Sequence, residues 1–284
     1  MTRTYPVDRY GLIHRGRAKA AGYTDYELNS AVNRGELIKL FRGVLIPADD
    51  RDALGTHRSL AIAVYLGAVG DKVLSHESAA VLLGLEMLKP DLTRAQLTTG
   101  YRAGGRKDAH RHMRVGVIPD EQRTVVDGIA VTSLERTAVD VACTTAMGFA
   151  GALAVFDSAL RNGADAEEIT RLLKRKRRGV ECARRAFDFA DASAENPGES
   201  WGRAQMIEAG LPVPRLQHMF YDERGKLIAR TDYDWEGQLV AEFDGDVKYR
   251  KLLRPGENAT DVVTREKKRE DNLRRIGVMV IRFT

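Results

Sequence analysis

Residues 227–244 have the sequence LIARTDYDWEGQLVAEFD, in which two runs of strand-forming residues flank the turn Glu236-Gly237-Gln238. With Gly237 at the centre of the turn, the predicted hairpin pairs Trp235 with Leu239 and Asp232 with Glu242. Side chains alternate between the two faces of a strand, so apolar residues are expected on one face and acids on the other. The apolar face comprises Tyr233, Trp235, Leu239, Ala241 and Phe243, and the acidic face comprises Asp232, Asp234, Glu242 and Asp244.

The acidic face is a candidate site for a divalent cation. Like charges that lie opposite one another on paired strands destabilise a sheet, and a bound cation would neutralise them. Carboxylate oxygens suit Mg²⁺ or Mn²⁺, which lower the pKa of a bound water and polarise a phosphate. Lys248, four residues after Asp244, would then help to hold the attacking water or the charge of the transition state. The spacing is equally compatible with a solvated acidic face that binds no metal.

The segments around this hairpin predict a separate C-terminal domain over residues 193–284. Residues 191–198, DASAENPG, are typical of a linker, and a helix from Glu199 to Ala209 and a strand from Leu216 to Tyr221 are expected before the hairpin. The motifs GES at 198–200, GLP at 210–212, EFDG at 242–245 and KKRED at 267–271 occur in this order. Together they resemble the nuclease-like domain related to very-short-patch-repair endonucleases, within the PD-(D/E)XK superfamily of restriction-endonuclease-like folds.

That resemblance implies roles for individual residues. Asp232 and Glu242 match the metal-binding acids, Glu199 matches the acid that the first helix supplies, and Gln217 matches a polar residue that lines the site. Asp244 stands where the broader superfamily usually has lysine. The resemblance therefore implies a metal shell of Asp232, Glu242 and Asp244, with Lys248 as a substitute for the missing lysine.

The N-terminal 50 residues carry most of the positive charge. The chain has a net charge of +5, and residues 1–48 contain eight Lys and Arg against four Asp and Glu. A helix is expected over 6–21, and Thr24 with Glu27 forms a capping box for a second helix whose inward stripe would be Tyr26, Leu28 and Val32. Two short strands around a basic tip follow, and this order predicts a winged helix-turn-helix.

In a winged helix the second helix enters the major groove and the wing contacts phosphate. The expected DNA-binding residues are Tyr26, Asn29, Ser30, Asn33 and Arg34 on the helix, and Lys39 and Arg42 on the wing. The alternative is a small structural subdomain whose basic residues form a solvated face. A palindromic target would favour a homodimer.

The middle region, residues 51–192, predicts a mixed α/β domain without a catalytic pattern. Helices are expected over 57–67, 75–85, 132–143, 149–161 and 166–175, with strands over 92–99 and 113–117. Histidines of the kind found at His76, His110 and His112 are usually packing or surface groups. The motifs VNRGEL at 32–37, LSHESAA at 74–80 and VTSLERT at 131–137 resemble the AbiEi-like antitoxins of type IV toxin–antitoxin systems. This resemblance implies a winged-helix autorepressor that acts beside a nucleotidyltransferase toxin.

Other functional classes are less compatible with the sequence. The most apolar stretch, Leu60 to Val69, is about half of the ~20 residues needed to cross a bilayer, and the N-terminus has no secretory signal, so a cytoplasmic location is expected. The multidomain α+β and α/β organisation thus leads to two hypotheses. The first is a DNA-binding, Mg²⁺- or Mn²⁺-dependent endonuclease, and the second is a non-enzymatic antitoxin and transcriptional autorepressor with a degenerate nuclease fold.

Overall fold

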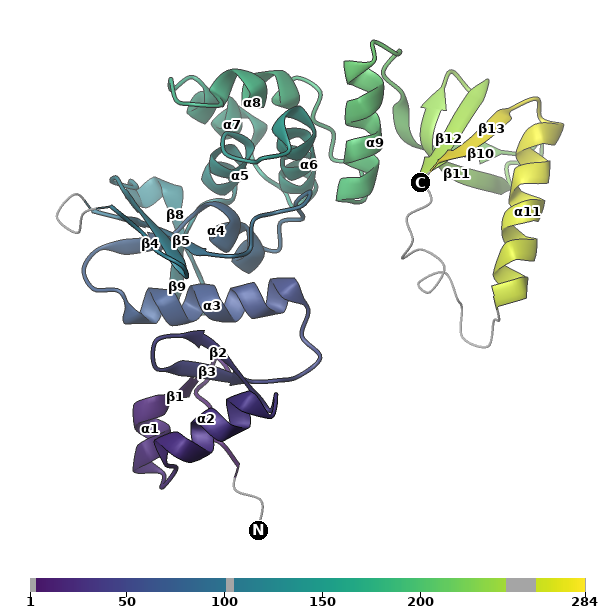
Figure 1. Ribbon diagram of the computed structural model, residues 1–284. Coiled ribbons are helices and arrows are strands. Elements are labelled where there is room, and N and C mark those ends of the chain that lie inside the picture. The colour runs from purple at the N-terminus through teal and green to yellow at the C-terminus, as the bar shows by residue number, and fades with distance from the viewer. Residues whose placement is uncertain (1–3, 101–104, 244–258, 284) are drawn as a thin grey trace. The chain divides into compact units, whose positions relative to one another are not determined.

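The computed structural model of the chain describes residues 4–100, 105–243 and 259–283, and its elements form two compact units (Figure 1). The first unit comprises Met1–Leu85, Lys89–Thr144 and Ala164–Arg178. The second comprises Glu86–Leu88, Thr145–Gly163 and Gly179–Thr284. Among the described helices, none is long and apolar enough to cross a membrane.

The N-terminal part of the first unit combines two short helices with a three-stranded sheet, and its β2–β3 hairpin stands where the wing was predicted. Its elements are β1 (Ile13–His14), α1 (Arg15–Ala20), α2 (Asp25–Asn33), β2 (Leu37–Phe41) and β3 (Val44–Pro47), with sheet order β1-β3-β2. The predicted capping box is confirmed, because Thr24 Oγ1 accepts from the Glu27 N–H at 3.1 Å and Glu27 Oε2 accepts from the Thr24 N–H at 2.7 Å.

Two expectations for this region were wrong. The first helix does not span 6–21, because Asp8 accepts hydrogen bonds from the N–H groups of Tyr10 and Leu12 and the chain then enters β1 before α1 begins. Tyr26 does not belong to the inward stripe of α2, since it is 82% exposed, whereas Leu28 and Ala31 are buried.

A six-stranded mixed sheet forms the rest of the first unit. Its order is β6-β7-β5-β4-β9-β8. The strands are β4 (Lys72–Leu74), β5 (Ala95–Thr99), β6 (Arg106–Lys107), β7 (Arg111–Val115), β8 (Arg123–Val126) and β9 (Ile129–Thr132), and the helices are α3 (Ala53–Gly67), α4 (His76–Leu83), α5 (Leu134–Ala142) and α7 (Ala166–Leu173). Helix α3 lies between the small sheet and the large one (Figure 1), and one apolar core joins them through Leu40, Leu60 and Leu97.

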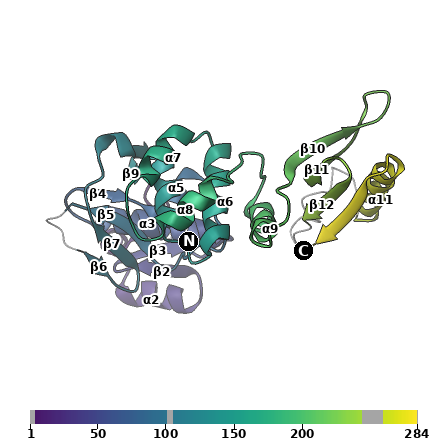
Figure 2. The same cartoon turned by 90° about the horizontal axis from the view of Figure 1, so that it is seen from above.

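Within the described residues, the second unit combines four helices with a four-stranded sheet of order β10-β11-β12-β13. Its elements are α6 (Gly148–Arg161), α8 (Val180–Phe187), α9 (Pro197–Glu208), β10 (Arg215–Tyr221), β11 (Leu227–Trp235), β12 (Leu239–Phe243), α11 (Ala259–Arg275) and β13 (Met279–Phe283). The predicted hairpin register is confirmed, because Trp235 pairs with Leu239 and Tyr233 with Ala241. Helices α9 and α11 cover opposite faces of this sheet (Figure 2).

The segment 191–198, expected to be a linker, is fixed at both ends. Asp157 of α6 is fully buried, and its carboxylate accepts hydrogen bonds from the Asp191 N–H at 2.8 Å and from the Ser200 hydroxyl at 2.7 Å. Arg203 of α9 forms an ion pair with the same carboxylate at 2.7 Å. Gly202 allows α9 to approach the sheet closely, since a Cβ there would lie 2.7 Å from the Tyr233 hydroxyl.

Candidate nucleic-acid interface and carboxylate site

The outward face of α2 carries all five residues that were expected to meet a major groove. Tyr26, Asn29, Asn33 and Arg34 are exposed and Ser30 is half-buried. Arg34 donates to the Ser30 hydroxyl at 2.6 Å and pairs with Glu36 at 2.7 Å, and an exposed pair of this kind contributes little to stability. These contacts can therefore be exchanged for contacts with a nucleic acid at low cost.

A pocket of about 410 Å³ opens beside the β2–β3 turn of the wing. It is lined by Arg15, Lys39, Phe41, Arg42, Gly43, Leu45 and His110. The tight β2–β3 turn that forms its rim needs Gly43, whose φ of +75° strains other residues. The structure thus brings the two predicted wing cations, Lys39 and Arg42, to one concave surface.

Sequence reasoning missed two members of this pocket. Arg15 comes from the start of α1, where its guanidinium also pairs with Asp25 at 2.7 Å. His110 precedes β7 and packs edge-on against Phe41, with ring centroids 6.0 Å apart, while the Arg111 guanidinium lies 5.4 Å from the centre of the same ring. The position of Arg15 beside the basic turn was open to inference from the winged-helix order, but no local signal places His110 there.

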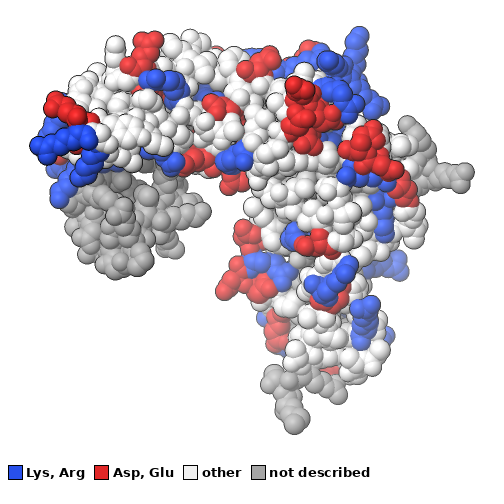
Figure 3. All heavy atoms as spheres, turned by 180° about the vertical axis from the view of Figure 1, so that it is seen from behind, with Lys and Arg blue, Asp and Glu red and all other residues white. Residues whose placement is uncertain are grey.

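On the face seen in Figure 3, the described residues form no broad field of one sign. In Figure 3, lysine and arginine side chains lie beside aspartates and glutamates over the face in view. Isolated surface charges are screened within about 8 Å at physiological salt, so the alternating pattern attracts nucleic acid weakly. The concentration of cations at the wing is therefore the more informative feature.

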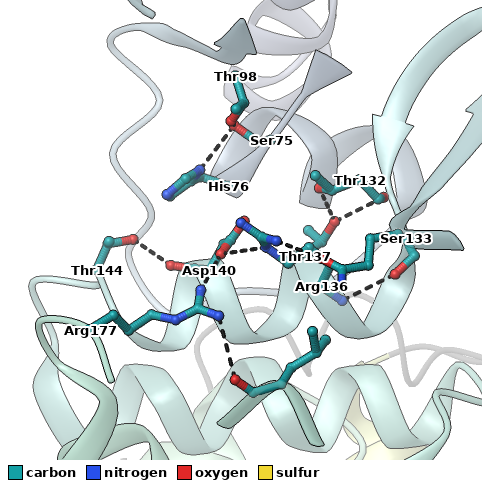
Figure 4. A network of polar contacts seen from close by, with 12 residues as sticks. Ser75, His76, Thr98, Thr132, Ser133, Arg136, Thr137, Asp140, Thr144 and Arg177 are labelled. Carbon is teal, nitrogen blue, oxygen red and sulfur yellow. Dashed lines mark hydrogen bonds and ion pairs between the residues drawn. The ribbon is translucent and has the colours of Figure 1, made fainter. Parts of the chain in front are cut away.

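The strand β4 leads into α4 through a buried histidine. His76 adopts a left-handed φ of 54° and is 7% exposed. Its Nδ1 lies 3.0 Å from the Ser75 hydroxyl, which in turn accepts from the Thr98 hydroxyl at 3.0 Å (Figure 4). Burial lowers the pKa of His76 from 6.5 to about 4, so the ring is neutral at pH 7. His76 is therefore a neutral ring in the interior of the first unit.

A neighbouring network accounts for part of the basic run at residues 174–178. Asp140 of α5 is buried and accepts from Arg136 at 2.9 Å and from Arg177 at 2.7 Å (Figure 4). Arg136 also donates to Gln122 at 2.6 Å. Arg177 thus anchors the end of α7 to α5 inside the first unit, and its charge serves the fold.

In the second unit, the structure brings Glu199, Gln217 and Asp232 together. The Gln217 amide donates to Glu199 Oε2 at 3.1 Å and to Asp232 Oδ1 at 3.5 Å. Gln217 has a left-handed φ of 53° within β10. Its neighbours Leu216 and His218 pair with Tyr233 and Thr231 of β11. The N-cap Asn196 donates to Glu199 Oε1 at 2.6 Å, and the Phe243 N–H donates to Asp232 Oδ2 at 2.9 Å.

The other acids of the predicted face have separate surroundings. Asp234 is buried and serves the hairpin, because it accepts from Arg215 at 2.8 Å and from the Gly237 N–H at 2.9 Å. Glu242 is 5% exposed and is bound by Arg269 of α11. Burial raises the pKa of Glu242, and Arg269 opposes that shift. Asp244 and Lys248 lie outside the described residues.

These carboxylates do not by themselves make a complete cation site. Over residues 4–100, 105–243 and 259–283, no group of three or more His, Cys, Asp or Glu side chains is placed to hold a metal. Asp232 is engaged by Gln217 and a backbone N–H, and Glu242 by Arg269. Only Glu242 Oε1, among the described carboxylate oxygens here, is buried without a hydrogen bond.

Comparison with known proteins relates the middle of the chain to one family. Residues 72–189, from the start of β4 to just beyond α8, match the family described as "AbiEi antitoxin C-terminal domain". The chain belongs to the AbiEi antitoxin C-terminal domain family. "Uncharacterized protein Rv2248" and "Uncharacterized protein MT2308", from two strains of Mycobacterium tuberculosis, are 33% identical over 225 residues, 78% of this chain and of each relative. The crystal structure of RV2827C protein from Mycobacterium tuberculosis is similar to this chain with a TM-score of 0.40 and 16% sequence identity. The match covers 76% of this chain and 84% of that chain.

All of the residues labelled in Figure 4 lie within the matched residues 72–189. Ser75, His76, Thr98 and Asp140 all belong to the AbiEi domain of this chain. The elements β1 to β3 precede it, and the four-stranded sheet follows it. Apart from His110, the residues that line the pocket precede the AbiEi domain in the sequence, and the carboxylate site follows it.

Proposed function

We propose that this chain is a DNA-binding antitoxin that represses transcription of its own gene and acts with a cognate toxin. Membership of the AbiEi antitoxin family supports the toxin–antitoxin context. The observation that carries the DNA-binding role is the pocket at the wing, where Arg15, Lys39 and Arg42 converge next to the exposed face of α2. A nucleotidyltransferase is the proposed class of toxin.

The geometry supports a division of labour between pocket and helix. Cations in the pocket neutralise phosphates and release counterions, which contributes affinity without sequence preference. The amides of Asn29 and Asn33 on α2 suit adenine edges and Arg34 suits guanine. Two copies of the chain on a palindromic operator would present two such helices to successive major grooves.

The salt dependence of binding tests the pocket. The test uses a labelled duplex taken from upstream of the gene. Arg42→Ala and Lys39→Ala should each make the negative slope of the logarithm of the association constant against the logarithm of salt concentration less steep by about one. Arg171→Ala is the matched control, because Arg171 is an exposed arginine of the same unit that pairs with Glu168 on α7, away from the wing. Unchanged slopes in both pocket variants would contradict the proposed phosphate site.

A metal-dependent endonuclease activity of the C-terminal domain is the second candidate. Its support is the contact of Gln217 with Glu199 and Asp232, and the order of one helix, three strands, a helix and a strand around the sheet. Mg²⁺ or Mn²⁺ would be its cofactor, with Asp244 and Lys248 as further members of the site. Metal-dependent nicking of supercoiled plasmid by the wild type, lost in Asp232→Ala, would establish the endonuclease activity. Absence of nicking would contradict it and favour the DNA-binding antitoxin without nuclease activity.

A further inference from the structure

Arg269 on α11 contacts Glu242, which with Asp232 forms the carboxylate pair of the second unit. One of its Nη atoms forms an ion pair with Glu242 Oε2, and the other donates to the carbonyl oxygen of Arg230 at 3.0 Å. The side chain is 22% exposed, so most of the guanidinium is enclosed against the sheet. Two directed contacts, one to a side chain and one to the backbone, hold the charge at Glu242.

Burial of Glu242 requires such a partner. A carboxylate that is 5% exposed loses most of its hydration, and Asp232 raises the cost by like-charge repulsion. Two other arginines nearby have acids of their own, since Arg230 pairs with Glu195 and Arg282 with Glu270. Arginine keeps its charge at every accessible pH and suits a carboxylate better than lysine does.

We propose that Arg269 is the built-in counter-cation of the Asp232 and Glu242 pair, and that it competes with divalent cations for Glu242. A divalent cation would also neutralise the negative charge of Glu242, and it would need the same carboxylate that Arg269 binds. In this chain the Glu242 carboxylate is neutralised by Arg269, while Asp232 accepts hydrogen bonds from Gln217 and the Phe243 N–H. This inference is independent of DNA binding at the wing.

Calorimetric titration with Mn²⁺ tests the competition in the full-length chain. Arg269→Gln removes the charge and should bind Mn²⁺ at least about tenfold more tightly than the wild type, which corresponds to about 1.4 kcal/mol. Arg269→Lys keeps a charge and should resemble the wild type. Arg274→Gln is the matched control, because Arg274 lies on the same helix and pairs with Glu270. The gain should vanish when Glu242→Gln is added to Arg269→Gln.

Thermal unfolding provides a second readout that does not depend on cleavage. Arg269→Gln should melt below the wild type, because it leaves a buried carboxylate without compensation, and Mn²⁺ should raise its Tm more than that of the wild type. Equal Mn²⁺ affinity in the wild type and Arg269→Gln, or the same gain in Arg274→Gln, would overturn the proposal. The salt slope of DNA binding by the same variants should not change, so failure here is distinct from failure of the proposed function.

Discussion

The buried histidine of the AbiEi domain makes stability depend on pH in a way that one substitution should remove. His76→Asn is the suitable change, because asparagine accepts the left-handed backbone at φ 54° more readily than most residues and does not titrate. The substitution therefore removes the titrating ring without forcing the turn between β4 and α4 to rearrange.

The sign and size follow from the pKa of His76, which burial lowers from 6.5 to about 4. Between these values the unfolded chain binds a proton that the folded chain does not, so the free energy of unfolding decreases as the pH falls from 6.5 towards 4. Each unit of separation corresponds to about 1.36 kcal/mol, so the full effect is about 3 kcal/mol. About 2 kcal/mol of it should appear between pH 7 and pH 5.

Urea unfolding of the wild type and His76→Asn at pH 7, 6 and 5 measures this difference. The wild type should lose about 2 kcal/mol more than the variant between the two ends of the series. His110→Asn makes the same substitution at an exposed histidine of the same unit and is the matched control. Parallel profiles for the wild type and His76→Asn would refute the account of His76 as a buried neutral group.

Two further predictions concern stability. Asp157→Ala leaves the buried guanidinium of Arg203 without its ion pair and should lower the free energy of unfolding by about 3–5 kcal/mol, whereas Asp191→Ala, at the more exposed partner 4.0 Å from the same arginine, should cost less than about 1 kcal/mol. Equal costs in urea unfolding would contradict the buried-pair argument. Thr24→Ala should cost about 1 kcal/mol by removing the N-cap of α2, and Thr24→Ser should restore most of it; a neutral alanine variant would show that the cap contributes nothing.

Features set by neighbouring residues could be predicted from the sequence. The capping box of Thr24 and Glu27 spans three residues, and the register between β11 and β12 follows from the short turn at Gly237. The basic turn between β2 and β3 was predicted on the same grounds. In each case the local preference and the tertiary structure agree.

Features that depend on distant parts of the chain could not be predicted in this way. The strand β1 exists because Ile13 pairs with Leu45, and the pocket includes His110 only because the large sheet lies close to the wing. Arg269 lies in a strongly charged helix, where nothing in the local sequence marks it as the partner of Glu242. The predicted acidic face stays a prediction, because Asp244 lies outside the described residues, and the donors that bind Asp232, Asp234 and Glu242 depend on the fold.

Sequence preference in DNA binding tests the central claim most directly. Fluorescence anisotropy at a fixed salt concentration would compare a duplex from upstream of the gene with a scrambled duplex of equal length, for the wild type and for Asn33→Ala on α2. The account predicts that the wild type prefers the upstream duplex by about 10³-fold or more, and that Asn33→Ala loses about 1–3 kcal/mol of that preference while its salt slope stays the same. Equal binding of both duplexes by the wild type would contradict it.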